Sequence, residues 1–158
     1  MTTEQINKLV SEGVVPGEGG QRELIETHIS WVILGDEYVY KIKKPIQYSF
    51  LDFSSLELRK FYCERELELN KRLAANVYIA VVPIRESQQN ISIGGNEGTL
   101  IDYAVKMHKL KVERRMDKLL GKKEAVTVDI KKLAERIATF HKAATAIYHK
   151  DLSAIREE

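Results

Sequence analysis

The sequence contains little cysteine, little proline and no long apolar run. Cys63 is the only cysteine among 158 residues, which excludes an internal disulfide and a cysteine-based zinc site. No apolar run approaches the roughly 18 residues that indicate a membrane-spanning helix, and the first residues lack the pattern of a signal peptide. We therefore expect a cytoplasmic protein without membrane association, in which Cys63 is a packed helix residue.

The composition is that of an ordinary globular protein. Apolar residues make up 44% and charged residues 30%, and a chain of this length buries roughly 70% of its unfolded surface on folding. Residues 101–158 carry 14 basic and nine acidic side chains, a net charge of +5 that raises the question of nucleic-acid binding. Because the two signs are mixed along helical patterns and no aromatic platform accompanies them, a nucleic-acid partner is not expected.

The first 21 residues predict a helix and a linker. Apolar residues recur at helical spacing from Thr3 to Glu12, and Gly13 is the expected stop. The Gly-rich stretch at 16–20 contains Gly-x-Gly, a fragment of some phosphate-binding loops. Because no strand precedes it, we interpret it as a linker.

Residues 24–44 predict a β-hairpin that displays two lysines. Its second strand, Tyr38–Lys43, alternates after a turn at Gly35. Since side chains alternate along a strand, Lys41 and Lys43 share one face. Only one of them is expected to be central to a site.

The following segment predicts a long helix with a carboxylate on its apolar side. Ser54 and Glu57 fit a capping box for a helix from about Ser55 to Ala74. Glu66 falls on the apolar stripe of this helix. A carboxylate in such a position is costly without a cation, so we expect it to have a basic partner.

The rest of the chain predicts more strands and then helices. The predicted elements are strands at Tyr78–Ile84, Ile91–Ile93 and Thr99–Met107, the last two forming a hairpin, and helices at Glu113–Leu120 and from Thr127 to about Tyr148. Pro83 favours an edge position or a strand end, because proline cannot donate to a sheet. The predicted fold class is therefore α+β, an antiparallel sheet with one long helix packed on it, followed by C-terminal helices.

A strand lysine followed by a helix glutamate, in this order of elements, resembles the amino lobe of the protein-kinase-like fold. The sequence is most similar to the aminoglycoside phosphotransferase family, within an uncharacterised bacterial branch. The segments that carry the resemblance are Glu26–Val32, Tyr40–Pro45, Phe50–Ser54, Glu66–Asn70 and Val81–Ile84. The resemblance implies three parts: a leading helix and linker at 1–21, a nucleotide-binding lobe at 22–110, and the first helices of a truncated second lobe at 111–158.

The resemblance also implies an ATP site. Lys41 would bind the α and β phosphates of the nucleotide, and Glu66 would hold this lysine in position. Lys43 is the alternative for the phosphate role. Thr27 and Ser30 would lie in the loop over the phosphates, where hydroxyl and backbone N–H groups can donate to an anion.

The adenine would bind at the hinge between the lobes. The resemblance places this hinge at Met107, His108 and Lys109, whose backbone would hydrogen-bond the adenine edge while Met107 packs against the ring. His108 is more simply read as a solvated linker residue than as a catalyst.

The catalytic half of such an enzyme is missing from the pattern. His149-Lys150-Asp151-Leu152 is similar to the start of a kinase catalytic loop, but Arg156 stands where the metal-binding asparagine is expected. We therefore assign no catalytic residue and no metal ligand, and expect Mg with ATP only if the missing lobe supplies ligands. The chain is expected to be inactive alone, either as a truncated piece or as a stand-alone remnant, and the phosphoryl acceptor is not predicted.

The alternative is a non-catalytic module derived from a kinase lobe. Such a module would use the face left exposed by the absent lobe to bind another protein or a second copy of itself. Nucleotide affinity separates the two hypotheses.

Overall fold

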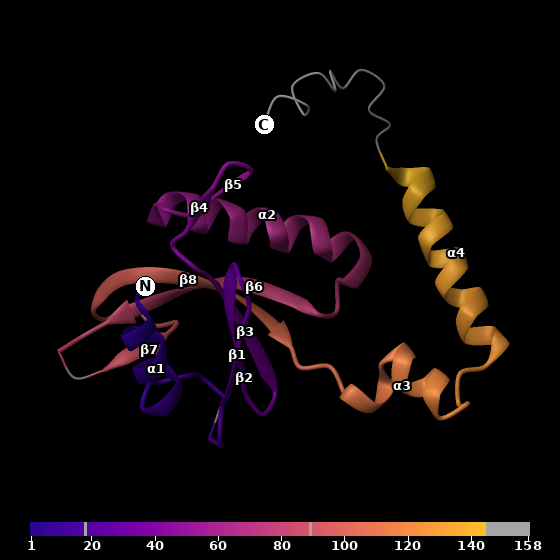
Figure 1. Ribbon diagram of the computed structural model, residues 1–158, viewed down its shortest axis with the longest axis horizontal. Coiled ribbons are helices and arrows are strands. Elements are labelled where there is room, and N and C mark those ends of the chain that lie inside the picture. The colour runs from indigo at the N-terminus through magenta and orange to yellow at the C-terminus, as the bar shows by residue number, and fades with distance from the viewer. Residues whose placement is uncertain (18, 89, 145–158) are drawn as a thin grey trace. The chain divides into compact units, whose positions relative to one another are not determined.

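The computed structural model describes residues 1–17, 19–88 and 90–144 (Figure 1). The chain divides into two units, Met1–Leu110 and Lys111–Glu158, which are described separately. Unit 1 holds the sheet and the long helix, and unit 2 is helical over the part that the structure describes. The predicted α+β class is confirmed.

Unit 1 is built on a six-stranded antiparallel sheet with the order β1-β2-β3-β8-β6-β7. Its strands are β1 (Glu23–Glu26), β2 (Ser30–Leu34), β3 (Tyr38–Lys43), β6 (Tyr78–Glu86), β7 (Ile91–Ile93) and β8 (Thr99–His108). A separate two-stranded hairpin consists of β4 (Gln47–Tyr48) and β5 (Leu51–Asp52). The predicted hairpin around Gly35 is confirmed as β2 and β3, and β1 extends it by one strand.

The second predicted hairpin is wrong in its pairing. β7 does not pair with β8; it pairs with β6, with Ile84 opposite Ile93, and β8 lies on the other side of β6. The connection between β7 and β8 crosses β6 through Gly94, Gly95 and Gly98, all of which have positive φ. β6 also runs past Pro83 to Glu86, so the proline does not end the strand.

Two helices cover opposite faces of the sheet. α1 (Thr3–Ser11) inserts Ile6 and Leu9 into a core that contains Tyr40 and Ile42 of β3. α2 (Leu56–Ala74) packs on β8 and β6 on the other face. In Figure 1, these two helices flank the sheet. The linker prediction for the first 21 residues needs one addition, because α1 belongs to the same core as the sheet.

The start of α2 corrects the predicted cap. Ser55, not Ser54, is the N-cap, and its hydroxyl accepts a hydrogen bond from the Leu58 N–H at 3.2 Å. Ser54 instead donates its hydroxyl to the Asp52 carboxylate at 2.6 Å. The helix therefore begins one residue later than the sequence predicted.

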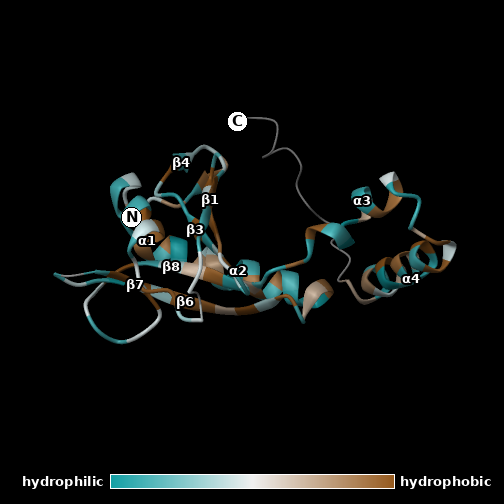
Figure 2. Ribbon diagram, turned by 90° about the horizontal axis from the view of Figure 1, so that it is seen from below, coloured by the Kyte–Doolittle hydropathy of each residue, from teal (hydrophilic) through white to brown (hydrophobic). Residues whose placement is uncertain are grey.

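Unit 2 contains a 3₁₀ turn, Val112–Arg114, and the helices α3 (Met116–Gly121) and α4 (Thr127–Ala143). The predicted start of α4 at Thr127 is confirmed, and the predicted end near Tyr148 lies outside the described residues. Ile130, Leu133 and Ile137 are exposed apolar side chains of α4, and Figure 2 shows its hydrophobic and hydrophilic residues. Among the described residues, no helix is both long and apolar enough to cross a membrane.

Candidate functional site

Glu66 bridges two lysines on the face of the sheet that α2 covers. Its Oε1 lies 2.9 Å from Lys41 Nζ, and its Oε2 lies 2.8 Å from Lys43 Nζ. The predicted contact between Lys41 and Glu66 is therefore present. The expectation that only one lysine would be central is wrong, because each carboxylate oxygen accepts from a different ammonium group.

The secondary structure explains this arrangement. Lys41 and Lys43 are two residues apart on β3, so both side chains leave the same face of the sheet. Glu66 comes from the middle of α2, which packs over the neighbouring strands β8 and β6. The helix thus brings a carboxylate over two lysines that lie more than 20 residues earlier in the chain.

The two lysines differ in their surroundings. The Lys43 side chain is 7% exposed, and its Nζ lies 4.8 Å from the centre of the Phe53 ring, a cation–π contact. The Lys41 side chain is 32% exposed. Lys43 is therefore enclosed, whereas Lys41 can reach a ligand from solvent.

Burial and charge compete at Glu66. Burial raises the pKa of this carboxyl, but the hydrogen bonds and charges of Lys43 and then Lys41 outweigh burial, so that the pKa is lowered overall. Tyr78, on β6, has its pKa raised by burial and by the negative charge of Glu66. The cluster therefore holds one carboxylate and two ammonium groups at neutral pH, an excess of positive charge that favours an anion.

Cys63 lies one helical turn before Glu66 and is fully buried. Burial raises the pKa of its thiol to about 12, while the positive charge of Lys43 acts in the opposite direction. A protonated, enclosed thiol is not a nucleophile. The prediction that Cys63 is a packed helix residue is confirmed.

Thr27 lies in the turn between β1 and β2, Ser30 is the first residue of β2, and both residues stabilise the turn. Thr27 Oγ1 accepts from the Ser30 N–H at 3.0 Å and donates to the Ser30 carbonyl at 2.9 Å. The Ser30 side chain is buried, and its hydroxyl has no hydrogen-bond partner among the described residues. His28 and Ile29, both exposed residues, form the tip of this loop, and the Ile29 carbonyl accepts from the Lys44 N–H at 3.0 Å.

Met107, His108 and Lys109 end β8 and begin the exit from unit 1. Met107 pairs with Val39 of β3 and Tyr78 of β6, on the face that carries Lys41. His108 lies on the opposite face, with its ring 5.5 Å from that of Tyr38.

Two backbone N–H groups at the predicted hinge are used within the protein. The His108 N–H donates to the Val77 carbonyl and the Lys109 N–H to the Glu37 carbonyl, each at 2.8 Å. Lys109 Nζ donates to the Gly35 carbonyl at 2.7 Å. The edge of an adenine placed at these residues would therefore have to bond to their carbonyl groups or to residues after Lys109.

A second charged link was missed by the sequence analysis. Arg59 of α2 donates to Asp102 of β8 at 2.9 Å, and both side chains are buried. The same guanidinium donates to the Phe53 and Ser54 carbonyls. This link fixes the first turn of α2 and the Phe53 ring under Lys43. The only signal in the sequence was a charged residue within an apolar strand pattern at Asp102.

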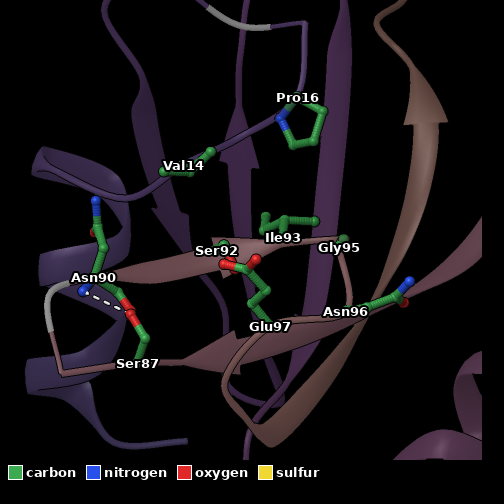
Figure 3. Close-up of a pocket in the computed structure, with 10 residues that line it drawn as sticks. Val14, Pro16, Ser87, Asn90, Ser92, Ile93, Gly95, Asn96 and Glu97 are labelled. Atoms are coloured by element: carbon green, nitrogen blue, oxygen red, sulfur yellow. Dashed lines mark hydrogen bonds between the residues drawn. The ribbon is translucent and has the colours of Figure 1, made fainter.

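A surface pocket of about 560 Å³ lies away from these lysines, beside β7 (Figure 3). Val14, Pro16, Ser92 and Glu97 are among the residues that line it, and the described part of its lining contains no lysine or arginine. Figure 3 shows the Glu97 carboxylate turned toward Ser92. Among the described lining residues the only charge is negative, and such a lining does not suit a phosphate. Within the described part of the chain, no three histidine, cysteine, aspartate or glutamate side chains are grouped to hold a metal ion.

Comparisons with known proteins find relatives of unassigned function. Uncharacterized proteins from Mycobacterium bovis and from two strains of Mycobacterium tuberculosis are each 31% identical to this chain over 119 residues. The match covers 75% of this chain but 22% of each relative, so the chain corresponds to about a fifth of these longer proteins. No family model matches the chain, and no solved structure matches it significantly.

Proposed function

We propose that unit 1 is the ATP-binding lobe of a kinase-like small-molecule phosphotransferase, related to the aminoglycoside phosphotransferases. The observation that carries this proposal is the 2.9 Å contact between Glu66 Oε1 and Lys41 Nζ, with Lys41 one-third exposed. A lysine on a sheet, held by a helix carboxylate and open to solvent, is the arrangement by which kinase-like lobes hold the α and β phosphates of ATP.

The apolar residues around Lys41 support a place for the base. Val39 precedes Lys41 by two residues on the same face, and Met107 is the cross-strand partner of Val39. Both are half-buried. A purine lying over Val39 and Met107 would direct its phosphates along the sheet toward Lys41. Its edge would bond to carbonyl groups at the end of β8 or to groups after Lys109, because the His108 and Lys109 N–H groups already have partners.

The proposal concerns binding, not transfer. The described residues of this chain supply a phosphate-binding lysine and its carboxylate partner, and we assign no general base and no metal ligand to them. We expect the chain to phosphorylate no acceptor by itself. Measurable transfer of phosphate from ATP to any hydroxyl compound by the 158-residue chain would contradict this part of the proposal.

Calorimetric titration with Mg-ATP tests the proposal. We expect a dissociation constant between about 1 μM and 1 mM, weakened about tenfold or more in Lys41→Ala, because the loss of a charge-assisted contact to phosphate costs about 1.4 kcal/mol or more. Lys60→Ala is the matched control, since Lys60 is a half-exposed lysine of α2 paired only loosely with Glu64 at 3.7 Å. Absence of heat with folded protein, or equal affinity in Lys41→Ala, would contradict nucleotide binding.

A second candidate is a self-associating module. The observation that favours it is the group of exposed apolar side chains on α4, where Ile130, Leu133 and Ile137 are 48%, 48% and 42% exposed. Sedimentation velocity over a hundredfold range of concentration tests it. Dimers that Leu133→Lys abolishes, together with no response to Mg-ATP, would favour this module over the nucleotide-binding lobe.

A further inference from the structure

The second lysine on Glu66 has a role of its own. We propose that Lys43 is a positioning residue, which keeps Glu66 in place through the second carboxylate oxygen when Lys41 turns toward a phosphate. This inference rests on the proposed nucleotide-binding function. It gives Lys43 a role that no residue has where the carboxylate pairs with a single lysine.

The geometry indicates different roles for the two lysines. Each donates to a different oxygen of Glu66, so neither has to leave for the other to bind. Lys43 is enclosed by Glu66 on one side and the Phe53 ring on the other, with 7% of its side chain exposed. An ammonium group so enclosed is poorly placed to exchange its carboxylate for a ligand from solvent, whereas Lys41 is open to one.

The burial of Glu66 explains why a second lysine is needed beside it. Glu66 is 14% exposed, so a carboxylate left there without a cation would be destabilised and would tend to take up a proton or move. The titratable groups that face it are Lys41 and Lys43 from β3, Tyr78 from β6 and Cys63 on α2 itself. Tyr78 and Cys63 are neutral at pH 7, because the pKa of each is raised. When a phosphate draws Lys41 away, Lys43 is the cation that remains.

The protonation of Glu66 tests this role without a nucleotide. We would follow the Glu66 carboxyl carbon by NMR during an acid titration of the wild type, Lys43→Met and Lys41→Met. We expect the pKa of Glu66 to rise by about one unit or more in Lys43→Met, by less in Lys41→Met, and to return toward the wild-type value in Lys43→Arg. An equal or larger rise in Lys41→Met would overturn the proposal.

The lysine side chains of the wild-type chain give a second test, which stands even if Lys43→Met fails to fold. We would record the Nζ resonances of Lys41 and Lys43 before and after the addition of Mg-ATP. The expected result is a shift at Lys41 with little change at Lys43, whereas an equal or larger shift at Lys43 would overturn its positioning role. No shift at either lysine would instead contradict the nucleotide-binding function, and the titration of Glu66 would still decide whether Lys43 holds that carboxylate.

Discussion

Arg59 and Asp102 form an ion pair that is closed off from solvent between α2 and β8. The Arg59 Nε lies 2.9 Å from Asp102 Oδ1 and 3.1 Å from Oδ2, and the two side chains are 6% and 0% exposed. Asp102 Oδ1 also accepts from the Tyr103 N–H, and Oδ2 lies 3.1 Å from the Met1 amino group. The helix that carries Glu66 is thus fastened to the sheet two turns earlier by a second charged contact.

Loss of the Asp102 charge is expected to destabilise the protein strongly. In Asp102→Asn the Arg59 guanidinium stays buried without its counter-charge, and we expect the free energy of unfolding in urea to fall by about 3 kcal/mol or more. Glu64→Gln is the control, because it removes an acid from the exposed Lys60–Glu64 pair, which should change stability by about 0.5 kcal/mol or less. Similar losses in the two variants would contradict the buried ion pair.

The cap of α2 gives a second stability prediction. Ser55→Ala removes the hydroxyl that accepts from the Leu58 N–H and should cost about 1 kcal/mol of unfolding free energy. Ser54→Ala removes an exposed hydroxyl that donates to Asp52, and we expect a loss of less than about 0.5 kcal/mol. Chemical denaturation of the two variants measures the difference. A larger loss in Ser54→Ala would indicate that Ser54 is the N-cap, as the sequence pattern predicted.

Acid is expected to weaken the attachment of α2. Because the pKa of Glu66 is lower in the folded chain than its ordinary value of 4.5, the unfolded state binds this proton more readily. The contribution of Glu66 to stability is therefore present above about pH 4.5 and is lost as the pH falls through the folded-state pKa. Unfolding free energies between pH 3 and 7 should fall less steeply toward acid in Glu66→Gln than in the wild type. Parallel curves would show that Glu66 is not held by the lysines.

The thiol of Cys63 should be unreactive toward thiol reagents in the native protein. It is fully buried, and burial raises its pKa to about 12. We expect a maleimide or disulfide reagent at pH 8 to label it about 100-fold or more slowly than in urea, where unfolding exposes the thiol. Labelling in native buffer at the rate of a free cysteine would contradict the packing of this part of α2.

Local patterns were enough to predict the elements that place the candidate site. Strand alternation put Lys41 and Lys43 on one face, and helical spacing put Glu66 on the inner side of α2. The contact of Glu66 with both lysines could not be predicted from the sequence, because residue spacing does not show that one carboxylate will bond to two lysines. The pairing of Arg59 with Asp102 could not be predicted either, since 43 residues separate the two and no local rule relates them.

The errors also have local causes. Ile91–Ile93 has only three residues, too few for its pattern to choose between β6 and β8 as a neighbour, and the glycine-rich turn allowed either path. Ser54 and Ser55 are adjacent and chemically equivalent, so the pattern could not tell which hydroxyl would cap the helix. Nothing in the sequence indicated that the N–H groups of His108 and Lys109, at the predicted hinge, would bond to Val77 and Glu37.

The shared carboxylate also bears on how this sequence can change over generations. Replacement of either Lys41 or Lys43 leaves Glu66 with one cation at 2.9 or 2.8 Å, so each single step avoids an isolated buried charge. Replacement of Glu66 itself leaves two ammonium groups on one face of β3 with no acid between them. Replacement of Lys43 alone also keeps the lysine proposed to bind phosphate, so lineages descended from this protein should tolerate drift at Lys43 before they tolerate drift at Lys41 or at the glutamate.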